Sequence, residues 1–323
     1  MHDVYSIRPH VQILTRAAIH LPNFSDHERI NRIYDLLGPT PRLCINYLID
    51  PPELARYEDD IRKALSSITL ETLEKLFKDS SSLAMDDIPS KICLISRNNV
   101  EDMASLSIVK PITPSIQSRL AGQIRTLERR EQIRLFKEFT KVPSSRGVAG
   151  VLFEAAAQLK LQDGMKLELI PMVRLSPTKK IPQPQWYSSH IHLHNQLLEA
   201  SRQRALQQKI VIHVNPSQTL EYTDDGPSSI EPDIFYVPEL TNQVALDLFI
   251  LLNGLLFLFQ FTIAGTHDIK PGLVDFLATC QDIPPMDKWR FVFILSPNST
   301  VICPQPWRLE LCTLQLYSAV IAL

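Results

Sequence analysis

The sequence VALDLFILLNGLLFLFQFTIAGTHDIK, residues 244–270, is almost continuously apolar up to Ala264 and then turns polar. An apolar run of this length is compatible with a membrane-spanning helix, a buried helix or two buried strands. The dipeptide Asn253-Gly254 lies between two apolar runs of similar length, and it is the strongest short-range signal for a β-hairpin. Neither flank carries the Trp/Tyr belt or the Lys/Arg cluster that is typical of a membrane span. The pattern therefore favours a hairpin of two buried strands, and we expect no membrane partner.

Three polar side chains interrupt these apolar strands. Asp247 lies near the start of the first strand, and Gln260 and Thr262 are two residues apart in the second. Residues two apart in a strand point to the same face of the sheet. A carboxylate in a buried strand costs free energy unless it is paired or bound to a metal ion. Asp247 is therefore either a candidate metal ligand or a residue at the frayed strand end, satisfied by backbone or solvent.

The composition is that of an ordinary globular protein, with 21% charged and 45% hydrophobic residues. The net charge of −2 means that any surface for binding phosphates must be a local patch. Five cysteines without C-x-x-C spacing suggest neither a zinc site nor a disulfide framework, and are typical of a reducing intracellular compartment. We therefore expect an intracellular protein, and a nuclear location is an open alternative. The pair Lys179-Lys180 is too short to indicate a nuclear localisation signal. The first ten residues lack the apolar segment of a secretory signal.

The periodicity predicts an α/β fold with a helical N-terminal region. Residues 1–110 are expected to be mainly helical, residues 111–146 to form a basic helical linker, and residues 147–323 to form an α/β domain. Within that domain we expect an insertion at about residues 175–242. The predicted helices are 24–38, 49–65, 69–79, 147–161 and 270–280, and the predicted strands besides the hairpin are 165–175 and 289–297.

The basic linker is a candidate surface for binding nucleic acid. Between Arg119 and Arg146 it carries eight Lys or Arg against three Glu, a local net charge of +5. Such clusters supply sequence-independent affinity for DNA or RNA, whereas the alternative is a solvated helix with ion pairs along its surface. The candidate phosphate-binding residues are Arg119, Arg125, Arg129, Arg130, Arg134, Lys137 and Lys141.

The run HIHLH, with His190, His192 and His194, has alternating histidines that could share one face of a strand. Zinc ligation is one interpretation. A cluster of this kind is more often a surface or interface feature, so we do not assign a metal to it.

The predicted element order, helix, strands, helix and strand, resembles the PD-(D/E)XK restriction-endonuclease-like fold with its αβββαβ core. Glu154 in the first helix, Asp247, and the Gln260-x-Thr262 pair carry this resemblance. The segments 144–161, 231–273, 289–297 and 303–323 also resemble the nuclease-like domain of fungal Crinkler-type and transposon-associated proteins. The resemblance covers roughly residues 144–323.

The resemblance implies metal-dependent hydrolysis of phosphodiester bonds in DNA or RNA, with Mg²⁺ or Mn²⁺ as the cofactor. Asp247 would be the metal-binding acid of the second core strand. Gln260 would occupy the acidic position of the third strand and offer its carbonyl oxygen. Glu154 would complete the metal shell directly or through water.

The chain departs from the family pattern at Thr262, where the family has a lysine that orients the attacking water. Lys270 or His267, just beyond the strand, could reach the same space from a different backbone position. Asp233 in the sequence EPD is the remaining candidate acid, behind the metal ligands. Gln260 carries one negative charge fewer than Glu, so the resemblance implies weaker Mg²⁺ binding than the full pattern gives.

A second resemblance concerns LLGPTPRLCINYL, residues 36–48, which is similar to the G-x-P-R of a sensor-two element in the lid of AAA-like ATPases. Arg42 would then be the residue that reads the γ-phosphate of a nucleotide. The chain contains no G-x-x-x-x-G-K-[ST] motif, which implies a shortened family member without ATPase activity.

Three functions remain open from the sequence. The chain is a metal-dependent nuclease of an effector or mobile-element family, a non-catalytic module that binds nucleic acid or protein, or an inactive fragment of an ATPase–nuclease effector. Converging Glu154, Asp247 and Gln260 would favour the first, and binding that weakens with salt and persists without Mg²⁺ would favour the second.

Overall fold

The structure is a computed structural model of the 323-residue chain. It describes residues 33–34, 38, 50–69, 71–74, 91–97, 107–141, 146–175, 184–188, 196–223, 226–238, 246–304 and 310–323. Arg42 and the HIHLH run lie outside these residues, so the expectations for them stay predictions. The chain divides into two compact units, Met1–Leu127 with Glu138–Val148, and Glu128–Lys137 with Ala149–Leu323.

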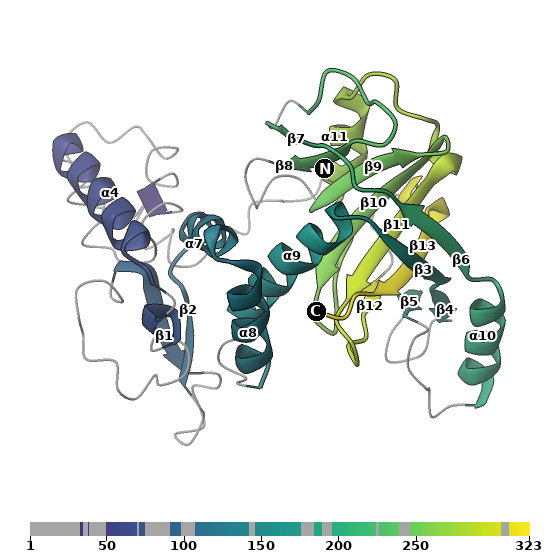
Figure 1. Cartoon of the computed structure of the whole chain (residues 1–323), viewed down its shortest axis with the longest axis horizontal. Helices are drawn as coiled ribbons and strands as arrows, with labels where there is room; N and C mark the ends of the chain where they lie inside the picture. Colours follow the sequence, from purple (N-terminus) through teal and green to yellow (C-terminus); the bar gives the residue numbers. More distant parts are fainter. Residues whose placement is uncertain are drawn as a thin grey trace, which may run out of the picture. The chain divides into compact units, whose positions relative to one another are not determined.

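The elements of Figure 1 are, in chain order, α4 (Pro51–Ser66), β1 (Cys93–Arg97), β2 (Ser107–Pro111), α7 (Pro114–Thr126), α8 (Arg129–Phe139), α9 (Arg146–Gln162), β3 (Met165–Pro171), β4 (Val173–Leu175), β5 (Gln185–Tyr187), α10 (Gln196–Gln207), β6 (Ile210–Val214), β7 (Thr219–Tyr222), β8 (Phe235–Pro238), β9 (Leu248–Leu252), β10 (Leu255–Thr262), α11 (Gly272–Thr279), β11 (Trp289–Leu295), β12 (Ile302–Pro304) and β13 (Gln315–Val320). Two short 3₁₀ turns, Met286–Lys288 and Glu310–Thr313, precede β11 and β13.

The first unit contains the predicted helix α4 and a sheet that the sequence did not indicate. The α4 helix begins at Pro51 because the Asp50 side chain accepts a hydrogen bond from the backbone N–H of Glu53 at 3.1 Å. Strands β1 and β2 pair antiparallel as a separate two-stranded sheet. The periodicity predicts mainly helices here, and the structure differs because short apolar runs do not distinguish a strand from a helix.

The basic linker forms two helices instead of one continuous stretch. The α7 helix begins after Thr113, whose hydroxyl accepts a hydrogen bond from the Ile116 N–H at 3.1 Å. It ends before Leu127, which is extended, and α8 begins two residues later. The α8 helix packs on α9, with the rings of Phe136 and Phe153 5.5 Å apart.

The apolar stretch forms the predicted β-hairpin. Strands β9 and β10 pair antiparallel from Leu255–Leu252 to Phe259–Leu248. Asn253 and Gly254 form the turn with φ angles of 50° and 74°, and two consecutive positive φ angles are the signature of a type I′ turn. Among the described residues, no helix is both long and apolar enough to cross a membrane.

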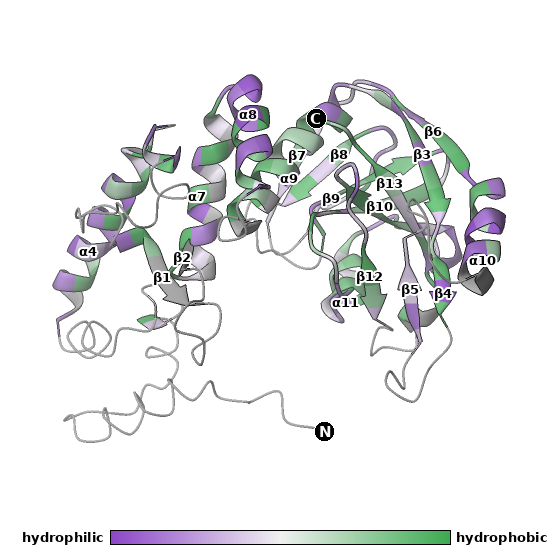
Figure 2. Cartoon of the chain, turned by 90° about the horizontal axis from the view of Figure 1, so that it is seen from below, coloured by the Kyte–Doolittle hydropathy of each residue, from purple (hydrophilic) through white to green (hydrophobic). Residues whose placement is uncertain are grey.

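The second unit has an α/β fold built on an eight-stranded mixed sheet with the order β6-β3-β13-β11-β10-β9-β8-β7. Strands β8, β9 and β10 form an antiparallel meander, and α11 connects β10 to the parallel neighbour β11. A three-stranded sheet, β12-β5-β4, accompanies the main one. Helices α9 and α11 lie on opposite faces of the main sheet (Figures 1 and 2).

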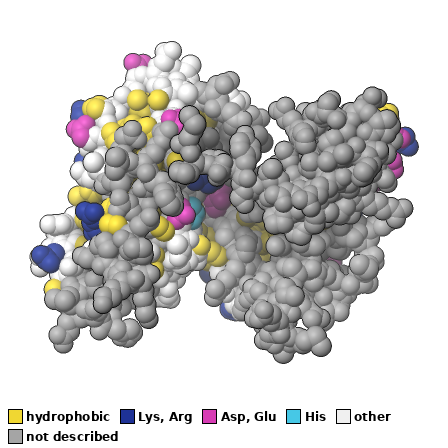
Figure 3. All heavy atoms as spheres, turned by 180° about the vertical axis from the view of Figure 1, so that it is seen from behind, with side chains coloured by type: hydrophobic (Ala, Val, Ile, Leu, Met, Phe, Trp, Pro, Cys, Tyr) yellow, Lys and Arg dark blue, Asp and Glu magenta, His cyan; other side chains and the backbone are white. Residues whose placement is uncertain are grey.

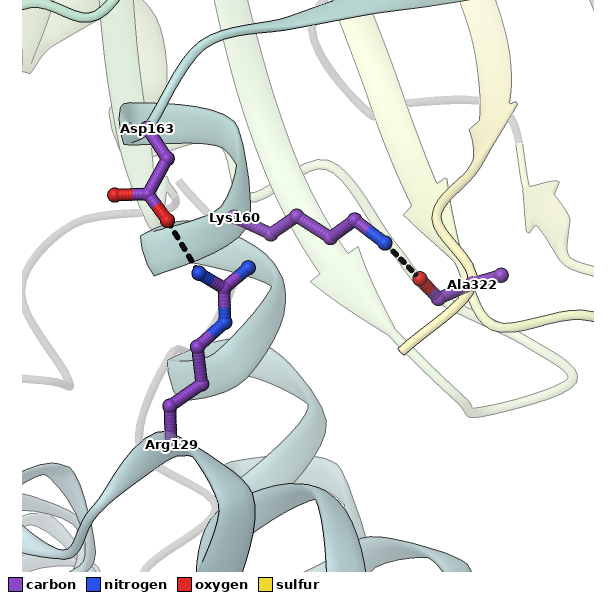
Figure 4. Close-up of polar contacts among 4 residues, drawn as sticks. All are labelled: Arg129, Lys160, Asp163 and Ala322. Carbon is purple, nitrogen blue, oxygen red and sulfur yellow. Dashed lines mark hydrogen bonds and ion pairs between the residues drawn. The ribbon is translucent and has the colours of Figure 1, made fainter.

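Both faces of the central strands are buried, as expected for strands covered on two sides. On one face Phe249, Leu258 and Phe291 pack in a cluster with Leu273 and Phe276 of α11. At the C-terminal end of α9, Lys160 donates a 2.5 Å hydrogen bond to the carbonyl of Ala322, just past β13 (Figure 4).

The strand beside the hairpin is not the one that the sequence predicts for an αβββαβ core. Residues 165–175 form β3 and β4, and β3 pairs with β6 and β13 on the far side of β11. The place beside β9 is taken by β8, which belongs to the segment expected as an insertion. The β8 strand has only four residues, so its sequence carries too little periodicity to identify its partner.

Candidate functional site

Asp247 and Gln260 lie side by side at the open end of the hairpin, where β9 begins and β10 ends. The Gln260 amide Nε2 donates a hydrogen bond to Asp247 Oδ2 at 2.8 Å, and the backbone N–H of Phe261 donates to the same oxygen at 2.6 Å. The Asp247 N–H in turn donates to the Phe259 carbonyl at 3.1 Å, which extends the antiparallel ladder by one residue. The structure therefore brings together two of the three predicted metal ligands.

This pair lies at the edge of the sheet where ligands bind in many α/β proteins. Strands β10, β11 and β13 are parallel, and their carboxyl ends are at Thr262, Leu295 and Val320. Strand β9 runs antiparallel to β10, so its amino end, next to Asp247, lies at the same edge. Ligands of open α/β sheets bind outside the carboxyl ends of the strands.

Aromatic side chains flank the pair, and no sequence motif predicts them. Phe293 is the direct neighbour of Gln260 on β11 and is fully buried. On the other side, Tyr222 of β7 packs with its ring centroid 5.6 Å from that of Phe249 and 5.3 Å from that of Phe276. Burial raises the pKa of the Tyr222 hydroxyl, and the nearby Cys280 thiol and Asp247 carboxylate raise it further. A long-range aromatic contact of this kind has no local sequence signal.

Glu154 lies on α9, which is on the opposite face of the main sheet from α11 (Figure 2). Gln260 is two residues from Leu258, which packs with α11, so the Gln260 side chain is on the α11 face. Gly150, one helical turn earlier, lies close to Ile263, since a Cβ built on it would be 3.8 Å from Ile263 Cγ1. Residues four apart share a helix face, so Glu154 lies on the part of α9 that passes the end of β10. Glu154 is half-buried there, and a metal shell that includes it would have to form around the strand ends.

Thr262, at the position where the resemblance predicts a lysine, has a local structural contact. Its side chain is only 6% exposed, and its Oγ1 accepts a hydrogen bond from the Ala264 N–H at 3.0 Å. This bond closes a turn at the end of β10. The hydroxyl is therefore used to end the strand.

His267 and Lys270, the two candidates to replace that lysine, have different surroundings. The His267 ring is half-buried, with its centroid 6.0 Å from that of Phe293. Burial lowers the pKa of His267, the backbone carbonyl and charge of Asp268 act against this, and the Lys270 charge lowers it further. Lys270 itself is exposed, and its carbonyl accepts a hydrogen bond from the Leu273 N–H at the start of α11.

Asp233 lies away from the pair, contrary to the role behind the metal ligands that we expected for it. Its N–H donates to the Leu251 carbonyl at 3.0 Å, near the turn of the hairpin. Leu251 is four residues from Asp247, or roughly 13 Å along an extended strand. Asp233 has a φ of 61° and is exposed, which fits a turn residue that leads into β8.

The predicted phosphate-binding residues differ in their surroundings. Arg129 forms an ion pair with Asp163, between the start of α8 and the end of α9 (Figure 4). Exposed side chains follow one stripe of α8 at positions Arg130, Arg134 and Lys137. Seen from behind, the described side chains mix acidic, basic and hydrophobic groups (Figure 3). Outside the stripe, Arg119 on α7 and Lys141 after α8 are exposed, and the side chain of Arg125 lies outside the described ones.

The Asp247–Gln260 pair suits a hard cation by the type of its donor atoms. Mg²⁺ prefers carboxylate and carbonyl oxygens and usually needs only one or two carboxylates beside waters and phosphate. Gln260 presents its amide nitrogen to Asp247, and a half-turn of the terminal amide would present Oε1 instead. In the described part of the chain, no group of three or more His, Cys, Asp or Glu side chains converges. The chemistry of the pair is thus compatible with a hard divalent cation, with one carboxylate and one amide oxygen as its protein donors.

Comparisons of the chain with models of protein families, with curated proteins and with solved structures yield no match.

Proposed function

We propose that the second unit is a PD-(D/E)XK-like nuclease domain that hydrolyses phosphodiester bonds of DNA or RNA with Mg²⁺ or Mn²⁺. The observation that carries the proposal is the direct contact between Asp247 and Gln260 at the carboxyl edge of the sheet. A carboxylate and a carbonyl donor at one strand end are the minimum set of protein ligands that such a metal requires.

The topology supports the same proposal. A helix, α9, precedes the antiparallel meander β8-β9-β10, and α11 then leads to the parallel strand β11. This order is compatible with an αβββαβ core if strands β3 to β7 and helix α10 are an insertion between α9 and the meander. On that reading Asp247, just before β9, and Gln260 on β10 take the two metal-binding positions of the motif.

The residues of the chain have distinct tasks in this reaction. The metal ion, when bound, supplies a water of lowered pKa and neutralises charge on the scissile phosphate. Asp247 and Gln260 would bind the metal ion through their side-chain oxygens at the strand ends. Glu154, on the opposite face of the sheet, would reach the metal only around the strand ends and through a water. Phe293 and Tyr222 exclude bulk water from both sides of the pair, which strengthens the electrostatic interactions inside.

Replacing Asp247 with Ala is expected to lower Mg²⁺-dependent cleavage of plasmid DNA or RNA by at least about 10³-fold, because the only charged side chain of the pair is removed. Cleavage is measured with purified full chain in Mg²⁺, in Mn²⁺ and in EDTA. Asp287→Asn, an exposed acid before the amino end of β11, serves as the matched control. Equal background cleavage by wild type and Asp247→Ala would contradict the proposal.

A second function, a non-catalytic nucleic-acid-binding module, is favoured by one observation. The Asp247 carboxylate already accepts two N–H donors, from Gln260 and Phe261, so it is satisfied without a metal ion. In that case the exposed stripe of Arg130, Arg134 and Lys137 would bind phosphates. Binding in EDTA that weakens linearly with the logarithm of salt concentration, without cleavage in Mg²⁺, would support this function instead.

A further inference from the structure

Backbone hydrogen bonds tie the loop after β10 to Ile302 on either side of Thr266. The His267 N–H donates to the Ile302 carbonyl at 3.0 Å, and the Ile302 N–H donates to the Gly265 carbonyl at 2.9 Å. Thr266 and Ile302 form a parallel β-bridge between these bonds. The position of the His267 backbone therefore does not depend on its side chain, and a substitution at this position should leave the loop in place.

The ring of His267 lies on the same side of the sheet as the Asp247–Gln260 pair. Neighbouring residues of adjacent strands share a face, so Phe293 and Gln260 point the same way, with their strands about 4.8 Å apart. The imidazole centroid is 6.0 Å from the Phe293 ring centroid. One aromatic side chain therefore separates His267 from the proposed metal-binding pair.

The hydrogen bond of the imidazole identifies its basic nitrogen. Nδ1 lies 3.2 Å from the Asp268 carbonyl oxygen, which can only accept a hydrogen bond. Nδ1 must therefore carry the proton in the neutral ring, and Nε2 keeps its lone pair. Among the described residues, the charged groups that act on the ring are Asp268 and Lys270 on its own loop, and the aromatic neighbour from β11 is the apolar Phe293.

We propose that His267 replaces the missing family lysine and that its Nε2 takes the proton from the water that attacks the phosphorus. This inference rests on the proposed nuclease function. The water oxygen forms a new bond to phosphorus as its proton passes to Nε2. The bond from phosphorus to the leaving ester oxygen then breaks, and that oxygen takes a proton from solvent. His267 returns its proton to solvent, so no other reactant is needed.

The two other residues near this position are less suited to the role. The Thr262 hydroxyl is buried and accepts the Ala264 N–H, so it closes the strand end. The Lys270 side chain is exposed, whereas the His267 ring is half-buried beside Phe293. Burial keeps His267 neutral to lower pH than an exposed histidine, which a general base requires.

The placement is tested first without any cleavage. Mn²⁺ added to the full chain should broaden the ring resonances of His267 selectively, as followed by NMR and assigned with His267→Gln. His213, exposed on the edge strand β6, is the internal reference and should stay sharp. Asp247→Ala should abolish the broadening. Equal broadening of His267 and His213 would overturn the placement of His267 near the pair. The absence of any broadening in a chain that binds Mn²⁺ would overturn it as well.

The role is tested by kinetics in the same variants. His267→Gln should keep wild-type Mn²⁺ affinity and lose about 10²- to 10⁴-fold in cleavage rate, the range that general-base catalysis supplies. Free imidazole should restore part of the loss to His267→Ala. The wild-type rate should fall only when the pH is brought below 6.5, the ordinary pKa of histidine, because burial lowers the pKa of the His267 ring. The residual rate of the variant should not show this fall.

The outcomes separate the two proposals. A wild type that does not cleave in Mg²⁺ or Mn²⁺ overturns the nuclease function and this inference with it. A wild type that cleaves, with a His267→Gln variant within twofold of its rate, overturns only the role of His267 and leaves the ring as a packing partner of Phe293.

Discussion

Replacing Gln260 with Glu is expected to destabilise the metal-free chain and to strengthen Mg²⁺ and Mn²⁺ binding. In the wild type the Gln260 amide donates to Asp247 Oδ2 at 2.8 Å. The substitution removes this donor and places a second carboxylate against the first, and two carboxylates at such a distance cannot both ionise without cost. We expect a loss of about 2 kcal/mol in EDTA, in the range for an unsatisfied buried partner.

The same substitution should raise Mn²⁺ affinity by about tenfold or more, because ligand charge sets the affinity of oxygen sites for divalent cations. Binding to the native state alone then raises the melting temperature as metal is added. Thermal unfolding in EDTA and in Mg²⁺ measures both effects. Gln281→Glu adds the same charge at an exposed position after α11 and is the control. Two variants with identical unfolding curves in both conditions would contradict a metal site at Asp247 and Gln260.

Truncating Phe293 to Ala is expected to destabilise the second unit by about 3–5 kcal/mol, the usual cost of such a cavity. Phe293 is 0% exposed, and its ring centroid is 5.0 Å from that of Phe291. It also separates His267 from the candidate metal ligands, so the truncation should loosen both. Phe293→Leu should cost less, because it leaves a smaller void.

Urea unfolding followed by tryptophan fluorescence measures this loss. All three tryptophans, Trp186, Trp289 and Trp307, belong to the second unit, so the signal reports that unit. Leu220→Ala, at a side chain that is 46% exposed, is the matched surface control and should change stability by less than about 0.5 kcal/mol. A loss below about 1 kcal/mol for Phe293→Ala would mean that the ring does not order this end of the sheet.

The parts of the fold that depend on local chemistry could be predicted from the sequence. Asn253-Gly254 adopts two positive φ angles at low cost, so the dipeptide indicated the hairpin. A two-residue turn also fixes the register of the strands, which is why Asp247 meets Gln260. The helices α4, α9 and α11 have caps or apolar runs that locate them within a few residues.

The parts that depend on distant pairing could not be predicted in this way. No local pattern in residues 165–175 predicts that β3 pairs with β6 and β13. In the same way, no local pattern predicts that β8 lies beside the hairpin. Asp233 was placed among the candidate acids by its sequence motif, whereas its pairing with Leu251 puts it near the opposite end of β9. The position of His267 depends on the bond to Ile302, 35 residues further on, and no periodicity encodes such a contact.

The most direct test of the metal site is a titration of the metal-free full chain with Mn²⁺, followed by electron paramagnetic resonance, in wild type and Asp247→Ala. The proposed site predicts one Mn²⁺ per chain in the wild type and its loss in the variant, because Asp247 is the only carboxylate of the contacting pair. Identical binding curves for the two proteins, or no binding by either, would contradict a metal site at these strand ends and would leave the binding-module function as the better explanation of this domain.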